Sequence, residues 1–181
     1  ISCNKEKQTI KKPLDYVNPF IGTGAHGHTY PGATTPFGMM QLSPDNGVGG
    51  WDWCSGYHYS SDSIAGFSHL HLSGTGIGDL CDLLVMPVSR DIDIINKKDH
   101  RSYSSRFSHA TEIATPGYYK VLLEKDSINA ELTTSKRVGY HRYTYKKGEQ
   151  QSVLIDLGFA INWDSPLATF LEVEDANTLS G

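Results

Sequence analysis

Residues 22–32 form the first run whose side chains could do chemistry, and they read GTGAHGHTYPG. The run contains the G-x-G-x-x-G spacing of a dinucleotide-binding turn, but such a turn must lead into a helix. Here a Tyr-Pro-Gly sequence follows at once, which argues against that site. His26 and His28 share one face of an extended chain and could bind a metal ion. Because no cysteine or carboxylate lies within five residues of them, we favour polar loop histidines that donate hydrogen bonds.

A second cluster, residues 50–59, reads GWDWCSGYHY and places four aromatic rings within nine residues. Side chains that form hydrogen bonds lie between the rings, namely Asp52, Cys54 and His58. The apolar face of a pyranose packs on an indole ring, and a carboxylate or an imidazole binds its hydroxyls. The cluster therefore suits a sugar, and an aromatic loop that holds two sheets together is the structural alternative. Composition alone leaves both interpretations open.

The third cluster, residues 66–79, reads GFSHLHLSGTGIGD. His69 and His71 alternate, and two aspartates follow them, which is a candidate set of metal ligands. An isolated H-x-H pair is weak evidence for a metal, so we favour histidines that line a polar cleft. Cys54 acting as a nucleophile with one of these histidines is a further alternative, although its flanking residues are typical of no such family.

The segment that must position these clusters has an unusual charge distribution. From Pro13 to Ser89 there is no lysine, arginine or glutamate, but there are six aspartates and five of the eight histidines. Thirteen of the eighteen glycines lie between Gly22 and Gly78. A solvated surface normally carries many lysines and glutamates, so we predict that this surface is covered. The glycines indicate irregular backbone with positive φ angles.

The whole chain has 181 residues, with sixteen lysines and arginines against twenty aspartates and glutamates, and a formal net charge of −4. A chain of this length can bury one good core or two small ones. The charge balance lacks the basic footprint of a protein that binds nucleic acid. No run of 18 apolar residues occurs, so no membrane-spanning helix is predicted.

Beyond residue 80 the sequence changes to short apolar stretches separated by turn residues. In residues 128–134 apolar and polar side chains alternate, as expected for a strand with one buried face. No stretch shows a helical period of useful length. We therefore predict an all-β fold, an antiparallel β-sandwich or barrel, with residues 22–78 mostly in loops and short strands. The predicted strands are 80–88, 117–125, 128–134, 138–146 and 152–157.

Three cysteines are too few for a disulfide scaffold. Cys54 and Cys81 could pair, although spacing alone cannot show it. Cys3 stands at the start of a polar, lysine-rich segment, and a chain that begins Ile-Ser-Cys fits a precursor trimmed at a lipidation site. On this interpretation residues 1–14 are a flexible segment behind a lipidated Cys3, and the protein is an exported bacterial lipoprotein of the periplasm or outer membrane. The alternative is a cysteine of no consequence.

Taken in this order, and together with residues 16–24 (YVNPFIGTG), the three clusters resemble the amino-terminal domain of the family 92 glycoside hydrolases. Those enzymes are exo-acting, calcium-dependent α-mannosidases that invert the anomeric centre. The similarity runs from about Asp15 to Gly181 and includes TPGYY at 115–119 and RVGYHRY at 137–143. It implies that residues 15–181 form a β-sandwich of the galactose-mutarotase-like supersandwich type, with long glycine-rich loops, which this chain leaves incomplete.

The resemblance also implies a function. We expect the amino-terminal, substrate-contributing domain of an α-mannosidase that removes terminal α-linked mannose from glycans with inversion. The general acid, general base and calcium ligands are expected mainly in a carboxy-terminal (α/α) barrel domain outside this chain. No catalytic or metal-binding residue is therefore assigned here, and the chain alone is expected to be inactive. A stand-alone carbohydrate-binding module is the alternative, and a purely structural domain is a third hypothesis.

The residues at positions that match the family's motifs are candidates for binding the substrate. Trp51 or Trp53 is the better choice for a stacked sugar ring, and we expect an exposed aromatic patch around them and Tyr57. The acids inside the clusters, Asp52 and Asp79, are interpreted as binding or structural residues. The substrate-binding candidates are Gly24, His26, His28, Trp51, Asp52, Trp53, Cys54, His69 and His71.

Overall fold

The computed structural model describes residues 11–94, 99–161 and 165–181. Within these ranges the paired strands are antiparallel, and the helical elements are 3-10 turns of three or four residues. The predicted all-β, antiparallel fold is therefore confirmed. The candidate lipidation site, Cys3, lies outside the described residues.

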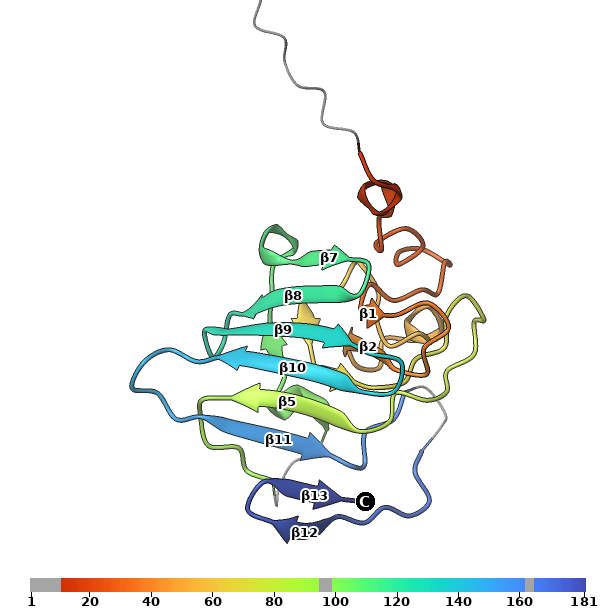
Figure 1. The fold of residues 1–181 in the computed structure, drawn as a ribbon. Coiled ribbons are helices and arrows are strands. Elements are labelled where there is room, and N and C mark those ends of the chain that lie inside the picture. Colours follow the sequence, from red (N-terminus) through yellow and green to blue (C-terminus); the bar gives the residue numbers. More distant parts are fainter. Residues whose placement is uncertain (1–10, 95–98, 162–164) are drawn as a thin grey trace, which may run out of the picture.

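Two main sheets build the molecule (Figure 1). The five-stranded sheet has the order β1–β2–β4–β5–β11, and its strands are β1 (Ala33–Thr34), β2 (Gln41–Asp45), β4 (Gly66–Ser68), β5 (Leu84–Val88) and β11 (Ser152–Asp156). The four-stranded sheet has the order β10–β9–β8–β7, and its strands are β10 (Gly139–Thr144), β9 (Ile128–Thr134), β8 (Tyr118–Leu123) and β7 (Ile113–Thr115). Consecutive strands of the second sheet are also neighbours in space, so it is a simple meander.

The remaining secondary structure among the described residues consists of short strands and 3-10 turns. Two short ladders pair β3 (Ser63–Ile64) with β6 (Ser105–Arg106) and β12 (Glu172–Asp175) with β13 (Thr178–Ser180). The 3-10 turns are η1 (Pro13–Tyr16), η2 (Trp51–Trp53), η3 (His100–Ser102) and η4 (His109–Thr111). No helix in the described part of the chain is long and apolar enough to cross a membrane.

The pattern of side chains explains the meander. In β9 the residues Ile128, Ala130 and Leu132 are buried and alternate with more exposed ones, as a strand with one buried face requires. The register places Leu132 opposite Tyr119 and Ala130 opposite Val121, so the buried faces of β8 and β9 coincide. The predicted strand at 80–88 is shorter, because Leu80, Cys81 and Leu83 have left-handed backbone and β5 begins only at Leu84.

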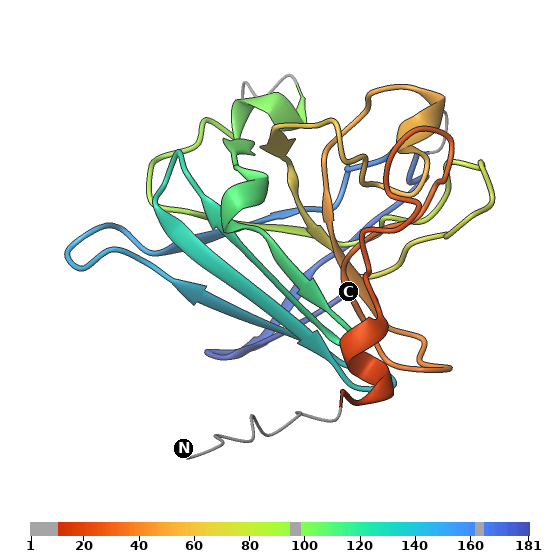
Figure 2. The same ribbon diagram turned by 90° about the horizontal axis from the view of Figure 1, so that it is seen from above.

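The core lies between the two sheets. Leu42, Phe67 and Met86 come from the five-stranded sheet, while Tyr119 and Leu132 come from the meander, and all belong to one buried cluster. Strands β1, β2 and β5 contact β9 across this layer, and Figure 2 shows the arrangement from above. Burying each large apolar side chain contributes about 1.5–3 kcal/mol, so this interface is the main source of stability.

A buried polar pair fixes the end of β2. The Asp45 and His71 side chains have no exposed surface, and Asp45 Oδ1 lies 2.9 Å from His71 Nε2. His71 Nδ1 lies 2.7 Å from the carbonyl oxygen of Gln41, so this nitrogen must carry a proton and donate. Asp45 Oδ2 accepts from the backbone N–H of Ser68 in β4. The pair therefore joins β2, β4 and the segment that follows β4.

We expect His71→Ala to lower the free energy of unfolding by about 3–5 kcal/mol, because it leaves a buried carboxylate without its partner. Arg106→Ala is the control, since Arg106 forms an ion pair with Asp62 in which both side chains are at least 70% exposed. An exposed pair contributes about 1 kcal/mol or less. Urea unfolding of the chain measures both, and similar losses in the two variants would contradict the role of the buried pair.

Candidate functional site

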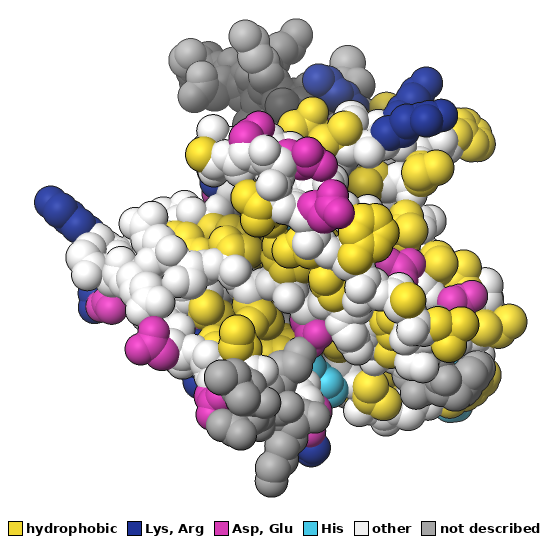
Figure 3. Space-filling view, turned by 90° about the horizontal axis from the view of Figure 1, so that it is seen from below, with side chains coloured by type: hydrophobic (Ala, Val, Ile, Leu, Met, Phe, Trp, Pro, Cys, Tyr) yellow, Lys and Arg dark blue, Asp and Glu magenta, His cyan; other side chains and the backbone are white. Residues whose placement is uncertain are grey.

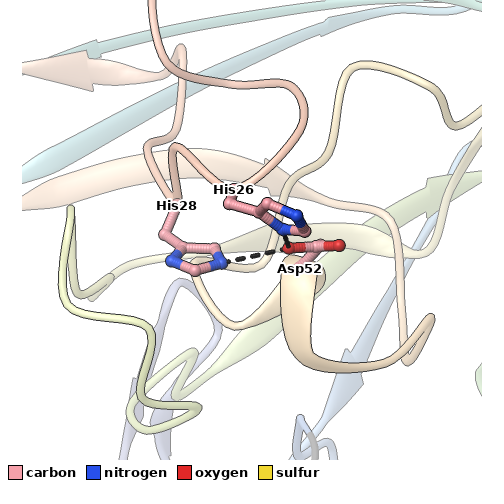
Figure 4. A group of neighbouring side chains, drawn as sticks. All are labelled: His26, His28 and Asp52. Carbon is pink, nitrogen blue, oxygen red and sulfur yellow. Dashed lines mark hydrogen bonds and ion pairs between the residues drawn. The ribbon is translucent and has the colours of Figure 1, made fainter.

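Two histidines of the first cluster meet an aspartate of the second (Figure 4). His26 Nδ1 lies 2.7 Å and His28 Nε2 lies 3.2 Å from the same carboxylate oxygen, Oδ1 of Asp52. The His26 side chain is 73% exposed, that of Asp52 is 27% exposed and that of His28 is 6% exposed. The group therefore has one buried imidazole at its base and one exposed imidazole at its rim. We refer to His26, His28 and Asp52 as the triad.

Backbone that favours glycine brings the triad together. Asp52 lies in η2, which follows Gly50, whose φ is 113°. A side chain at Gly27 would collide with the carbonyl of Gly22, so the loop that carries the histidines closes only with glycine there. His28 itself has a φ of 54°, a left-handed conformation that is uncommon outside glycine.

The third cluster supports the triad through Trp51. The indole N–H of Trp51 donates to the carbonyl of Gly76 at 2.7 Å. Its ring lies 4.3 Å from the His28 ring, edge to face, and 5.5 Å from the His26 ring. A side chain at Gly76 would approach both Trp51 and His28 closely, so glycine permits this contact. All three sequence clusters thus contribute to one surface, on which Trp51 remains 53% exposed.

The charge of the triad follows from its hydrogen bonds. The hydrogen bond from His26, with a second from His28, holds the pKa of Asp52 below its usual value. Asp52 is therefore a carboxylate at neutral pH, and it accepts hydrogen bonds but cannot donate a proton. Both imidazoles form hydrogen bonds to Oδ1 of Asp52, and neither bonds to its second carboxylate oxygen.

The two neighbouring tryptophans differ in their surroundings. The indole N–H of Trp53 donates to Ser61 Oγ at 2.8 Å, and its ring packs on that of His58 at 4.4 Å. Gly49 lies against the Trp53 ring and has no room for a side chain. Trp53 is therefore packed into the loop, while Trp51 offers an open ring face.

A second surface feature adjoins this one and was not predicted. A pocket of about 380 Å³ is lined by Asn18, Phe20, Thr23, Gly24 and Tyr59. The Tyr59 ring stacks on His109 at 4.0 Å with an interplanar angle of 8°. His109 Nδ1 lies 2.6 Å from the Glu112 carboxylate, which also accepts from the hydroxyls of two buried tyrosines, Tyr57 and Tyr119. Because His109 lies 50 residues from Tyr59 in sequence, local motifs could not reveal the contact.

Several predicted site residues point into the protein. His71 has no exposed surface and Cys54 only 1%, so neither offers an atom to a sugar in this conformation. Burial raises the pKa of the Cys54 thiol, which argues against a nucleophilic thiolate. Tyr57, expected in an exposed patch, is fully buried because its hydroxyl binds Glu112. Cys54 and Cys81 are both free thiols, so the considered disulfide does not form.

His69 does not bond to Asp52 but pairs with His141 of β10. Its Nδ1 lies 3.0 Å from the carbonyl of Leu83 and must donate, which leaves a lone pair on Nε2. His141 Nε2 lies 3.0 Å from that lone pair and donates to it, while His141 Nδ1 accepts from the Tyr143 hydroxyl at 2.6 Å. Both imidazoles are thus neutral. Burial lowers the pKa of His69 and lowers that of His141 to about 4.

An exposed indole beside imidazoles and a carboxylate, on an antiparallel β-domain, is a surface typical of carbohydrate-active proteins. The chain belongs to glycoside hydrolase family 92, because residues 16–181 match the family model for the "Glycosyl hydrolase family 92 N-terminal domain". The family predicted from the sequence is therefore confirmed. A curated relative, an uncharacterized secreted glycosidase of Arthroderma benhamiae, is 30% identical over 155 residues, which cover 80% of this chain and 20% of that protein.

Solved structures show the same relationship. A family 92 α-mannosidase from Bacteroides thetaiotaomicron, also solved in complex with mannoimidazole, is 42% identical with a TM-score of 0.76, and the match covers 82% of this chain and 20% of that one. A family 92 inverting mannosidase from the same organism is 31% identical with a TM-score of 0.66, and the match covers 81% and 20%. This chain thus spans about a fifth of the length of these relatives.

The His69–His141 pair predicts a pH dependence. The ordinary pKa of histidine is about 6.5, so the unfolded chain binds these protons before the folded chain does. The contribution of this pair to the free energy of unfolding is fully present above about pH 6.5. It is lost as the pH drops toward 4, by about 3 kcal/mol for His141. Below pH 4 this contribution levels off.

Urea unfolding between pH 4 and pH 7 measures this slope. His141→Gln removes one titrating imidazole, so its stability should depend less on pH than that of the parent chain. An unchanged slope in His141→Gln would show that other groups control acid unfolding.

Proposed function

We propose that this chain is the amino-terminal, substrate-contributing domain of an α-mannosidase that removes terminal α-linked mannose from glycans with inversion. The observation that carries the proposal is the exposed Trp51 ring beside the triad, in a domain 42% identical to that of a family 92 α-mannosidase. The relative described as an inverting mannosidase supports the stereochemistry.

The geometry assigns a role to each exposed group. The open face of Trp51 packs on the apolar face of a pyranose. Asp52, which is ionised, accepts from a sugar hydroxyl, and His26 donates to or accepts from a second one. Gly24 lies in the wall of the adjoining pocket, where Tyr59 supplies a further ring.

No catalytic residue is assigned within the described ranges. An inverting glycosidase needs a protonated acid and a separate base across the scissile bond. Asp52 cannot be that acid, because its hydrogen bonds to His26 and His28 favour the carboxylate. We therefore propose that the acid and base are supplied by a carboxy-terminal (α/α) barrel domain.

Calcium, expected from the family, does not fit the triad. Calcium takes six to eight oxygen ligands, whereas the triad offers two imidazole nitrogens and one carboxylate. We therefore propose that the calcium ligands lie mainly outside this chain, in the carboxy-terminal barrel domain.

A second exposed surface of the domain is suited to contact with another protein domain. Hydrophobic side chains are exposed around the β12–β13 hairpin, on the lower face of the molecule (Figure 3). They include Leu167, Phe170 and Val173, each at least 66% exposed. These side chains support the proposed barrel domain as a partner. The secreted relative supports export, and lipidation at Cys3 remains part of the proposal.

We expect Trp51→Ala in the complete enzyme to lower kcat/KM for an α-mannoside by roughly tenfold or more, with little change in thermal stability. The ring is exposed, so its removal costs sugar contact area rather than core packing. An increase in KM alone would indicate binding common to the ground and transition states, and a decrease in kcat would indicate transition-state binding.

Trp53→Ala is the matched control. Its ring is packed on His58 and bonded to Ser61, so we expect the larger loss in melting temperature here. Steady-state kinetics and thermal unfolding on both variants decide the assignment. Unchanged kcat and KM in the folded fraction of Trp51→Ala would contradict the proposed contact between Trp51 and the sugar.

We also expect this 181-residue chain, expressed alone, to show no hydrolysis of an aryl α-mannoside, with or without calcium. The physical reason is the missing acid and base pair. Release of the aryl group measures turnover, and any turnover above a no-enzyme control would contradict the proposal. Tight binding of mannosides by the chain alone would instead favour the stand-alone carbohydrate-binding module.

A further inference from the structure

The triad has the geometry of a coordination sphere. His26 Nδ1, His28 Nε2 and Asp52 Oδ1 all lie within 4.8 Å of one another, and two of the three separations are 2.7 and 3.2 Å (Figure 4). Zinc binds nitrogen and oxygen ligands at about 2.0–2.2 Å, so ligand atoms in a tetrahedral site lie about 3.3 Å apart. The two separations from Asp52 Oδ1 are thus slightly shorter than those in a tetrahedral site.

The ligand chemistry selects the class of ion. Two imidazoles and a carboxylate suit zinc, cobalt, nickel or copper, whereas calcium and magnesium prefer oxygen ligands alone. A divalent ion would displace the protons now shared with Asp52, and each neutral imidazole can carry its proton on the other ring nitrogen. The carboxylate would offset part of the charge of the ion.

Burial differs across the triad and defines an open side. His28 is nearly covered and packs against Trp51, whereas His26 is 73% exposed. We propose that His26, His28 and Asp52 form a binding site for a divalent transition-metal ion of the zinc type, with three protein ligands and a position open to solvent. The proposal does not rest on the sugar-binding role, but the two are coupled, because an ion would bind His26 and Asp52, the side chains proposed to bind sugar hydroxyls.

Another group, Asp45, His71 and Cys81, also brings donor atoms within 4.8 Å, but all three residues are fully buried. His71 and Asp45 already bond to each other, to Ser68 and to the Gln41 carbonyl. These hydrogen bonds account for the buried side chains without an ion, so this group is only a competing location in the metal titration.

The experiment titrates cobalt(II), followed by its visible absorption bands, and zinc, followed by calorimetry, into the full protein that carries this chain. The protein is first freed of metal with a chelator. We expect one ion at the triad with the intense absorption of a four-coordinate cobalt site. His26→Ala and Asp52→Asn should each weaken this binding by about tenfold or more, and His26 is exposed enough for its replacement to preserve the fold.

His141→Gln is the control, because it removes an imidazole from a close histidine pair outside the triad and should leave binding unchanged. Binding that persists in both His26→Ala and Asp52→Asn, or the absence of the cobalt spectrum in the parent, would overturn the proposal. Sugar binding measured with calcium supplied and no transition metal added tests the proposed function separately, so failure of one is distinguishable from failure of the other.

Discussion

The buried pairing of Asp45 with His71 is the constraint on which the glycine-rich half of the molecule depends. Loops without regular hydrogen bonding need other partners for their buried polar groups. Asp45 and His71 satisfy one another and tie β2 to β4. Gly56, in the second cluster, lies so close to Asp45 Oδ1 and the His71 ring that only glycine fits. The loop that carries Trp51 and Asp52 is therefore anchored beside this pair.

A second buried network acts in the same way on the other side of the aromatic cluster. Glu112 binds the hydroxyls of Tyr57 and Tyr119, and it holds His109 under the Tyr59 ring. The meander contributes Tyr119, so the proposed sugar-binding surface is positioned by the same sheet that builds the core. The buried charged groups thus bond to partners inside the domain, whereas Trp51 and His26 lie at the surface.

Local periodicity predicted the strands well and the site only in part. The alternation in residues 128–134 gave the bounds of β9, because a buried face is a property of neighbouring residues. The local sequence favoured hydrogen-bonding loop histidines, and His26 and His28 do bond to Asp52, but it could not name that partner because the carboxylate lies 24 and 26 residues away. Tyr57 was expected in an exposed patch and His71 in a polar cleft, but their burial depends on Glu112 and Asp45, whose positions only the fold reveals.

The central claim is that the surface formed by Trp51 and the triad contacts the substrate sugar. A crystal structure of the complete protein with a non-hydrolysable α-mannoside tests it most directly. We predict a sugar ring in van der Waals contact with the Trp51 indole and a hydroxyl within about 2.6–3.2 Å of Asp52 or His26. A mannoside bound elsewhere, with Trp51 open to solvent, would contradict the account.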